Sequence, residues 1–339
     1  MNNFIKEIII NKYIILFIII SILISLKNYY LLHIENNDFN INEINNYEDK
    51  LLYLNNRTEF FLKKRIKFLS QYNISYNESN LITFQEKVNW LIIHESPKYK
   101  SNIVDKIKLH DYSKKILGKD ICVPILKVYD DANEINYDEL PEKFILKLNH
   151  GSSMNLVCQN KSKFNYTKAS KILNNWKKIN YGLTTKEFQY MYVNRKIFAE
   201  EFLSNDLIDY KIFCFNGEPK FIKTRKQLRD PNDTKLHNYY DLDWKLIDLE
   251  TDMKGYIRDP KIKIKKPENL KLMLNYAKLL SDEFVFVRID FYEYNNTIYL
   301  GELTFSPDNS FLTWKNKTQN ITIGNLMDIS KIKSYLYNH

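Results

Sequence analysis

Alternating apolar and charged residues are clearest over residues 284–311, FVFVRIDFYEYNNTIYLGELTFSPDNSF. Two such runs flank a central Asn-Asn pair, so the pattern predicts a β-hairpin. A two-residue loop would put Asp290 and Glu302 on opposite faces, whereas a three-residue loop over 295–297 sets them directly across from each other. We predict the three-residue loop, because its register also leaves one face of the hairpin wholly apolar.

The other face of this hairpin then carries a polar set, Arg288, Asp290, Glu302 and Thr304. Burying these side chains requires partners for the charges. Two carboxylates beside an arginine are suited to Mg²⁺ and phosphate. A solvated face with a surface ion pair is the commoner arrangement of charges on a strand, and the pattern alone leaves both interpretations open.

An apolar run near the N-terminus is the longest in the chain. Unbroken apolar and Ser residues extend from Tyr13 to Leu26, about 14 residues, and counting from Ile8 gives about 19, close to the ~20 that span a bilayer. No small-residue cleavage site follows it, so residues 1–27 are predicted to be an uncleaved membrane anchor rather than a removed signal peptide.

The remaining residues, about 300, are enough for a globular body with a real core. Residues 28–80 are polar and Asn-rich and predict a linker or stalk. The basic cluster at 63–67, KKRIK, fits either anionic lipid or a solvated helix face. Residues 81–136 predict a small α/β lead-in domain, and the main domain follows over 137–330.

The composition limits the possible partners. Lys and Arg number 50 against 41 Asp and Glu, a net charge of +9, but the surplus is scattered along the chain. Nucleic-acid binding would concentrate it on one face, so no nucleic-acid partner is expected; a phosphate-rich ligand or an anionic membrane surface remains open. The cysteines, Cys122, Cys158 and Cys214, lack metal-ligand spacing and are expected to be buried thiols in a reducing compartment.

A second informative segment surrounds Lys147. This lysine ends an apolar run and precedes a loop of small residues, after which another strand begins. A strand lysine beside such a loop can present one cation and several backbone N–H groups to phosphates. The Walker sequence is missing. Taken singly, Lys147 also fits a solvent-facing strand residue and His150 an ordinary turn residue.

Two further strands are predicted around Asn216-Gly217, a strong hairpin signal. They carry Lys211 and Lys223 toward what could be a common cavity, and the acidic pair Glu200-Glu201 ends the apolar strand before them.

The order of these motifs resembles the ATP-grasp superfamily and, more closely, the TupA-like ATP-grasp family associated with cell-surface polysaccharide and teichuronopeptide biosynthesis. The resemblance covers about 137–326, a bit over half of the chain. It implies an α+β fold in which two antiparallel subdomains clamp ATP. The matching phrases are FILKLNHGSSMNLVC, IFAEEFL, DYKIFCFNGEPKFI, NYYDLDWKL, KPENL and FVRIDFYEYNNTIYLGELTFSPDNSF.

The resemblance also implies roles for individual residues. Lys147 matches the strand lysine that holds the α- and β-phosphates, and Lys211 and Lys223 are alternative candidates for a second phosphate-binding lysine. Arg288 matches the cation near the transferred phosphoryl group. The closing loop corresponds to His150, Gly151, Ser152 and Ser153; the hinge at adenine and ribose to Glu200, Glu201, Phe202 and Leu203; and the Mg²⁺ ligands to Asp290 and Glu302.

One position departs from the superfamily pattern. The metal strand usually reads Glu-x-Asn, whereas here it reads Glu302-Leu303-Thr304. A Thr hydroxyl is a weaker ligand, so a second metal, or Asp308 or Asn309 in its place, stays open.

The implied chemistry is ATP- and Mg²⁺-dependent joining of a carboxylate to an amine through an acylphosphate, within cell-surface polysaccharide biosynthesis. A glycan kinase would use the same lysines and carboxylates. A glycosyltransferase would favour a D-x-D pair, for which Asp241-Leu242-Asp243 is the nearest match. A non-catalytic, membrane-tethered scaffold of a polysaccharide assembly complex is the remaining alternative.

The orientation of the anchor poses a conflict. Lys6 and Lys12 precede the apolar run and favour an N-terminus inside, which would send the body across the membrane. Only Lys27 lies just beyond the run, so the bias is weak. Because ATP is present on the cytoplasmic side of the membrane, we expect a membrane-associated protein whose catalytic domain lies on that side.

Overall fold

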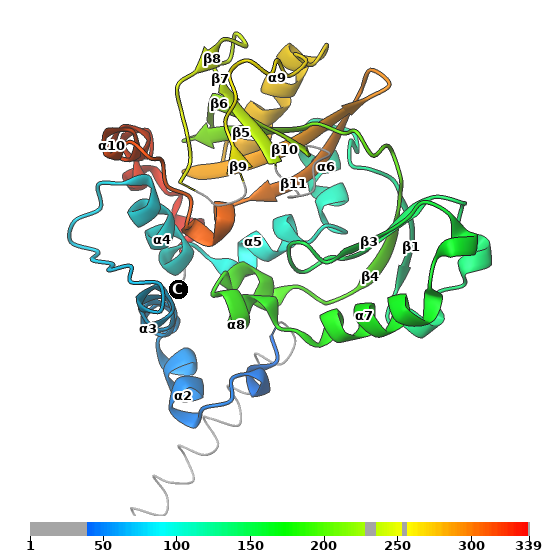
Figure 1. Cartoon of the computed structure of the whole chain (residues 1–339). Helices are drawn as coiled ribbons and strands as arrows, with labels where there is room; N and C mark the ends of the chain where they lie inside the picture. The colour runs from blue at the N-terminus through cyan, green and yellow to red at the C-terminus, as the bar shows by residue number, and fades with distance from the viewer. Residues whose placement is uncertain (1–38, 228–234, 253–255, 338–339) are drawn as a thin grey trace, which may run out of the picture. The chain divides into compact units, whose positions relative to one another are not determined.

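The computed structural model describes residues 39–227, 235–252 and 256–337 (Figure 1). The predicted anchor over 1–27 lies outside these residues, as does the start of the predicted stalk. Among the helices that the structure describes, none is both long and apolar enough to cross a membrane.

The chain divides into two compact units, residues 1–60 and 61–339, and the division falls inside the predicted stalk. In the first unit, a short 3₁₀ helix, η1 (Ile41–Glu43), precedes α2 (Tyr47–Asn55), and α3 (Arg57–Ser70) starts just before the division. The Tyr53 ring lies edge-on to Phe39 and Phe60, with centroids 5.6 and 5.4 Å away. This segment therefore contains an aromatic cluster, despite its polar composition.

The second unit contains a four-stranded antiparallel sheet in the order β1-β4-β2-β3. Its apolar face packs with α7 (Tyr166–Lys178), whose Leu173 is fully buried. The expected end of the lead-in domain, at 136, falls between β1 and β2, although both belong to this one sheet. The strands are β1 (Ile125–Tyr129), β2 (Phe144–Leu148), β3 (Asn155–Cys158) and β4 (Ile197–Glu201).

A larger, seven-stranded sheet follows in the chain, in the order β11-β10-β5-β6-β7-β8, with β9 beside β7. All its pairs are antiparallel except β7–β9. Helix α9 (Leu270–Ser281) packs on β5, β6 and β10. The strands are β5 (Asp209–Phe215), β6 (Glu218–Gln227), β7 (Lys235–Tyr240), β8 (Leu246–Ile247), β9 (Tyr256–Ile257), β10 (Phe286–Tyr294) and β11 (Thr297–Thr304). The predicted α+β architecture with two antiparallel sheets is confirmed.

The remaining helices of the second unit connect and cover the sheets. Helix α4 begins at a capping box in which Thr83 and Glu86 satisfy each other's backbone N–H groups. Helix α6 ends at Gly118, whose φ of 72° is the left-handed conformation that glycine adopts easily. The helices are α4 (Phe84–His94), α5 (Pro97–Val104), α6 (Leu109–Leu117), α8 (Tyr181–Thr185) and α10 (Lys317–Asn325), with the 3₁₀ helices η5 (Phe188–Tyr192) and η6 (Pro307–Ser310) among the shorter ones.

The β10–β11 hairpin differs from our prediction in its loop. Tyr294 pairs with Thr297, so the loop has two residues, and both asparagines adopt positive φ, 50° and 59°, as a tight hairpin turn demands. The predicted three-residue loop is therefore wrong. Asp290 nevertheless pairs with Glu302, because the register shifts by one residue between Asp290 and Phe291. A β-bulge supplies the extra residue that we assigned to the loop.

Candidate functional site

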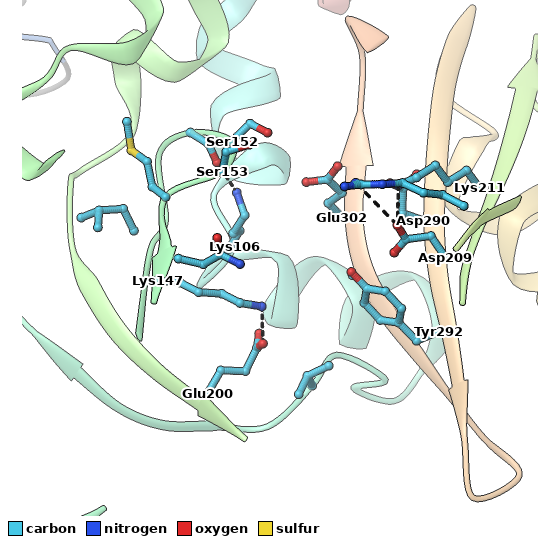
Figure 2. A pocket seen from close by; sticks show the side chains of 17 residues that line it. Lys106, Lys147, Ser152, Ser153, Glu200, Asp209, Lys211, Asp290, Tyr292 and Glu302 are labelled. Carbon is cyan, nitrogen blue, oxygen red and sulfur yellow. Dashed lines mark hydrogen bonds and ion pairs between the residues drawn. The ribbon is translucent and has the colours of Figure 1, made fainter. Parts of the chain in front are cut away.

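A cavity of about 260 Å³ lies between the two sheets of the second unit (Figure 2). The smaller sheet contributes one wall through β2, β4 and the β2–β3 loop, and the larger sheet contributes the opposite wall. The lining residues used below are Lys106, Lys147, Gly151, Ser152, Ser153, Glu200, Asp209, Lys211, Arg225, Asp290, Tyr292, Gly301 and Glu302.

One row of directly paired residues crosses the larger sheet at this wall. Glu302 on β11 pairs with Asp290 on β10, Asp290 pairs with Lys211 on β5, and Lys211 pairs with Lys223 on β6. Residues paired in this way share a face of the sheet. The row therefore runs from two carboxylates to two amines along a single face, in a protein interior where each charge needs a partner.

Asp290 is the most buried member of the row, with 1% of its surface exposed. Arg288 holds it in a two-point contact, Nε to Oδ1 and Nη2 to Oδ2, both at 2.7 Å, and Lys211 forms an ion pair with Oδ2. Burial raises the pKa of Asp290 against the opposing effect of these cations. For Arg288, the neighbouring carboxylates outweigh burial, and its pKa is raised.

Glu302 lies next to Asp290 and is the more accessible of the two carboxylates. Its Oε1 accepts hydrogen bonds from Arg288 Nη2 and the Thr304 hydroxyl, both at 3.1 Å. Burial alone would raise the pKa of Glu302, but Lys106, Arg288 and Lys211 together hold it at about 2. The side chain is therefore an anion at neutral pH, with oxygen atoms facing the cavity.

Lys106 comes from the α5–α6 connection, and sequence reasoning missed it. Its Nζ donates to the carbonyl oxygen of Gly151 at 2.5 Å, which ties it to the small-residue loop. Asn149 holds the same region together: its Nδ2 donates to Asp105 Oδ1 at 2.9 Å, and its Oδ1 accepts from the Lys196 backbone at 2.8 Å. A lysine in a turn between two helices carries no sequence pattern that would place it opposite a hairpin almost 200 residues away.

The comparisons with known proteins bear on this geometry. The sequence model of the TupA-like ATPgrasp family matches residues 86–328, which include both sheets and the cavity. The chain belongs to this family. The match confirms the resemblance on which our interpretation of the motifs was based, and no curated protein matches the chain significantly.

Several solved structures are similar to this TupA-like protein at low identity. The ATP-grasp ligase PsnB, complexed with a minimal precursor, is 12% identical over 62% of this chain, with a TM-score of 0.35. D-alanine–D-alanine ligase from Bacillus anthracis is 16% identical over 67% (66% of the ligase; TM-score 0.37). PurK, an N5-carboxyaminoimidazole ribonucleotide synthetase with ADP, is 15% identical over 62% (46% of PurK; TM-score 0.38). The chain spans about half of PsnB, 55%.

Most of the residues predicted to bind the phosphates line the cavity of this TupA-like protein. Lys147 lines it and forms an ion pair with Glu200 across β2 and β4. Ser152 and Ser153 line it too, with Gly151. His150 is fully buried instead, and its Nε2 lies 3.2 Å from the Ile179 carbonyl oxygen. Burial, with a smaller effect from Arg195, lowers the pKa of His150 to about 4, so its ring is neutral at pH 7.

The predicted hinge residues and the two candidate lysines also include some residues that line the cavity and some that do not. Of the four hinge residues, Glu200 lines the cavity, whereas Glu201, Phe202 and Leu203 do not. Lys211 lines it and contacts Asp290, whereas its neighbour Lys223 is not among the lining residues. Burial lowers the pKa of Lys223 to about 8. The geometry thus distinguishes two lysines that the sequence left equivalent. Arg288 is not among the lining residues, and it contacts the lining carboxylates Asp290 and Glu302.

Thr304 stands where the superfamily pattern has a metal-binding Asn, and Asp308 and Asn309 are the candidates to replace that ligand. The Thr304 hydroxyl is bound to Glu302. Asn309 accepts from Arg65 Nη1 at 2.8 Å and donates to the Thr185 carbonyl oxygen at 2.9 Å, so its side chain is engaged away from the cavity lining. Asp308 remains the more available of the two candidates that we named.

Proposed function

We propose that this TupA-like protein is an ATP- and Mg²⁺-dependent ligase that joins a carboxylate to an amine through an acylphosphate. The observation that carries the proposal is the row of Glu302, Asp290 and Lys211 on one wall of the cavity, opposite Lys147 and the small-residue loop on the other. Carboxylates on one side and lysines on both match what a metal-bound polyphosphate requires.

The charges of the cavity lining support a metal-dependent ligand. Four cations line it and four carboxylates line it, so the formal charges cancel. A polyphosphate alone would find no excess of positive charge, whereas one divalent cation adds two positive charges. We therefore expect ATP to bind with Mg²⁺ and weakly without it. The cations are Lys106, Lys147, Lys211 and Arg225, and the carboxylates are Glu200, Asp209, Asp290 and Glu302.

The residues present fit one Mg²⁺ ion. Mg²⁺ is usually held by one or two carboxylates together with substrate phosphate oxygens, and Asp290 and Glu302 both present carboxylates to the cavity. When bound, the ion would neutralise charge on the β- and γ-phosphates. Thr304 offers a hydroxyl oxygen next to Glu302, a weak third donor. Among the described residues, the oxygen donors at this wall are enough to hold one ion but not two.

The chain's own groups would then hold and orient the reactants. Lys147 and Lys211 would contact phosphate oxygens, exchanging the Glu200 and Asp290 carboxylates for them. The backbone of Ser152 and Ser153 would cover the phosphates and exclude water. A carboxylate of the substrate attacks the γ-phosphorus and ADP leaves; an amine then attacks the acylphosphate carbon, and phosphate leaves as the amide forms.

The family relationship suggests a substrate connected with cell-surface polysaccharide, such as a glycan uronate or an amino acid. We further propose that residues 1–27 anchor the protein in the membrane, with the catalytic domain on the cytoplasmic side, where ATP is available. Limited proteolysis of sealed vesicles tests the orientation: digestion of the body from the far side of the membrane would contradict it.

A glycosyltransferase is less well supported, because the D-x-D-like pair has a structural use. The Asp241 carboxylate accepts from the backbone N–H groups of Asp243 and Lys245 at 3.0 and 2.7 Å, which stabilises the turn between β7 and β8. This turn contributes no residue to the cavity between the sheets.

Calorimetric titration of the full-length protein with ATP, with and without Mg²⁺, tests the nucleotide site. We expect Mg²⁺-dependent binding that weakens at least tenfold in Lys147→Ala and in Asp290→Asn/Glu302→Gln, with no change in Lys220→Ala, an exposed lysine on β6. Phosphate release that needs both a carboxylate and an amine would identify the ligase. ADP with a phosphorylated product and no free phosphate would identify a kinase instead, and failure of the wild type to bind ATP would favour the scaffold.

A further inference from the structure

A second group of metal-ligating side chains lies outside the cavity lining. His110 is near the start of α6, and Asp120 and Cys122 follow the end of the same helix. Gly118 reverses the chain between them through its positive φ. As a result, one ligand atom from each of the three side chains lies within 4.8 Å of both others. The sequence suggested no metal spacing for Cys122, because a His ten residues before an Asp and twelve before a Cys matches no familiar motif.

The Asp120 carboxylate contacts both other residues of the group. His110 Nδ1 lies 2.7 Å from Asp120 Oδ2, and the backbone N–H of Cys122 donates to Asp120 Oδ1 at 2.9 Å. The Asp120 carboxylate is thus oriented by both of its neighbours. His110 and Asp120 keep 19% and 40% of their side-chain surface exposed, so an ion can reach them from solvent.

The ligand types select a class of ion. A thiolate, an imidazole and a carboxylate are the ligands that Zn²⁺ uses, with bonds of about 2.0–2.3 Å in a tetrahedral arrangement. Ligand atoms around such an ion lie roughly 3.3–3.8 Å apart. Two ligand atoms at the 4.8 Å limit would have to approach by roughly 1.0–1.5 Å, and His110 Nδ1 and Asp120 Oδ2, now 2.7 Å apart, would separate slightly; side-chain rotation can supply both changes. Three protein ligands leave the fourth position to water.

A His–acid contact by itself is no evidence of a metal, and the chain contains an example. His94 Nε2 lies 2.8 Å from Glu78 Oε1, much like His110 and Asp120, but no cysteine joins that pair among the groups found in the described residues. The thiol of Cys122 is therefore the distinguishing feature of the His110 group, and the His94 pair is a matched control for it.

We propose that His110, Asp120 and Cys122 bind a Zn²⁺-class ion that fixes the α6–β1 connection against the wall of the nucleotide cavity. Cys122 forms a β-bridge with Leu300 on β11, and the Leu300 N–H donates to the Ile121 carbonyl oxygen at 2.8 Å. The neighbours Val123 and Gly301 line the cavity. The ion would link the segment after α6 to helix α6 itself, directly behind the strand that carries Glu302.

Titration of the full-length protein with Co²⁺ in excess Mg²⁺ tests the proposal, because Mg²⁺ fills sites made of oxygen ligands while only a thiolate ligand gives Co²⁺ a near-ultraviolet charge-transfer band. We expect one equivalent of Co²⁺ with this band, displaced by one equivalent of Zn²⁺. Cys122→Ser should abolish the band, and His110→Ala and Asp120→Asn should weaken binding at least tenfold.

The controls separate this site from chance binding. Cys158→Ser and His94→Ala should leave the Co²⁺ band and affinity unchanged, because both side chains lie outside the group. A band that is missing in the wild type, or that persists in Cys122→Ser, would overturn the proposal. Equal weakening by His94→Ala and His110→Ala would do the same. Because the readout is a spectrum, its outcome is independent of whether the cavity proves to be an ATP site.

Discussion

Asp290 and Glu302 face each other across β10 and β11 although a two-residue loop closes the hairpin. A regular hairpin with that loop would pair Asp290 with residue 301 and turn Glu302 to the opposite face. The register shift at Gly301 adds one residue to β11 and brings Glu302 back to the cavity. The proposed metal site therefore depends on a bulge, and not on the turn.

Gly301 has no room for a side chain, and this leads to the first prediction. A Cβ there would lie 2.8 Å from the Tyr292 ring and 3.3 Å from the Asp290 carbonyl oxygen. Gly301→Ala should lower the free energy of unfolding by roughly 1–3 kcal/mol, as overpacking does, and weaken Mg²⁺–ATP binding. Urea unfolding and calorimetry measure the two effects. The double variant Gly301→Ala/Tyr292→Ala should show less than the sum of the single effects; strict additivity would argue against a clash with this ring.

The sequence predicted the hairpin and the pairing of Asp290 with Glu302, because alternation of polar and apolar residues reports directly on strand faces. It did not distinguish a longer loop from a bulge, since either inserts one residue and sets Asp290 across from Glu302. The two differ between that pair and the turn, where Phe291 faces Leu300 and not Gly301. Lys106 and Arg65 were beyond its reach for another reason. Their partners lie far away in the chain, and a lysine in a turn or an arginine in a basic cluster is locally indistinguishable from a solvated residue. Lys211 and Lys223 were separable only once the cavity was defined.

Lys106 is expected to keep Glu302 ionised at acidic pH. With Lys106 present, the pKa of Glu302 is about 2 although burial opposes this. This depressed pKa contributes stability that is present above the ordinary value, ~4.3, and lost as the pH falls toward 2. In Lys106→Met the pKa of Glu302 should rise, so that Mg²⁺–ATP affinity falls more steeply between pH 7 and pH 5 than in the wild type. Calorimetry across this range measures the effect.

Lys108→Met is the matched control for that series, because Lys108 belongs to the same connection but is exposed, with its Nζ on Asn102 at 2.8 Å. Its affinity should follow the wild-type pH profile. Parallel profiles for all three proteins would show that Lys106 does not act on Glu302.

Arg65 fits neither interpretation of the basic cluster at 63–67, a lipid-binding surface or a solvated helix face. It is fully buried, so it contacts neither lipid nor solvent. Its guanidinium donates to Asn89 Oδ1 at 2.7 Å, to the Asn309 carbonyl oxygen at 2.7 Å and to the Ser310 hydroxyl. Arg65 thus secures the loop after β11, in which 308–310 all have positive φ, a strained conformation for residues other than glycine.

Removing Arg65 should therefore destabilise the fold. Arg65→Met leaves several buried oxygens without a donor, each worth about 1–3 kcal/mol, so we expect a loss of roughly 3 kcal/mol or more in the free energy of unfolding. Lys67→Met, in the same helix but exposed, should change it by less than about 0.5 kcal/mol. Urea unfolding provides the comparison, and similar losses in both variants would show that the buried contacts of Arg65 contribute little.

Glu187 gives the fold a pH dependence near neutrality. It is buried beside Ser306, whose hydroxyl donates to its Oε1 at 2.5 Å. Burial raises the pKa of Glu187 to about 7, although Ser306 and Arg65 favour the ionised form. A raised pKa means that the folded state holds the proton more tightly than the unfolded state does. The resulting stability is fully present below about pH 4.3 and is lost as the pH rises through 7.

Glu187→Gln should remove this dependence, because the amide keeps a hydrogen-bonding group without the charge. We expect the wild type to lose on the order of 3 kcal/mol more than the variant between pH 4.5 and pH 8, since each unit of pKa shift corresponds to 1.36 kcal/mol. Urea unfolding at intervals of pH measures the difference, with exposed Glu48→Gln as the control that should follow the wild type. If the wild type and Glu187→Gln lose stability in parallel, another group titrates in this window and the burial of Glu187 has no such consequence.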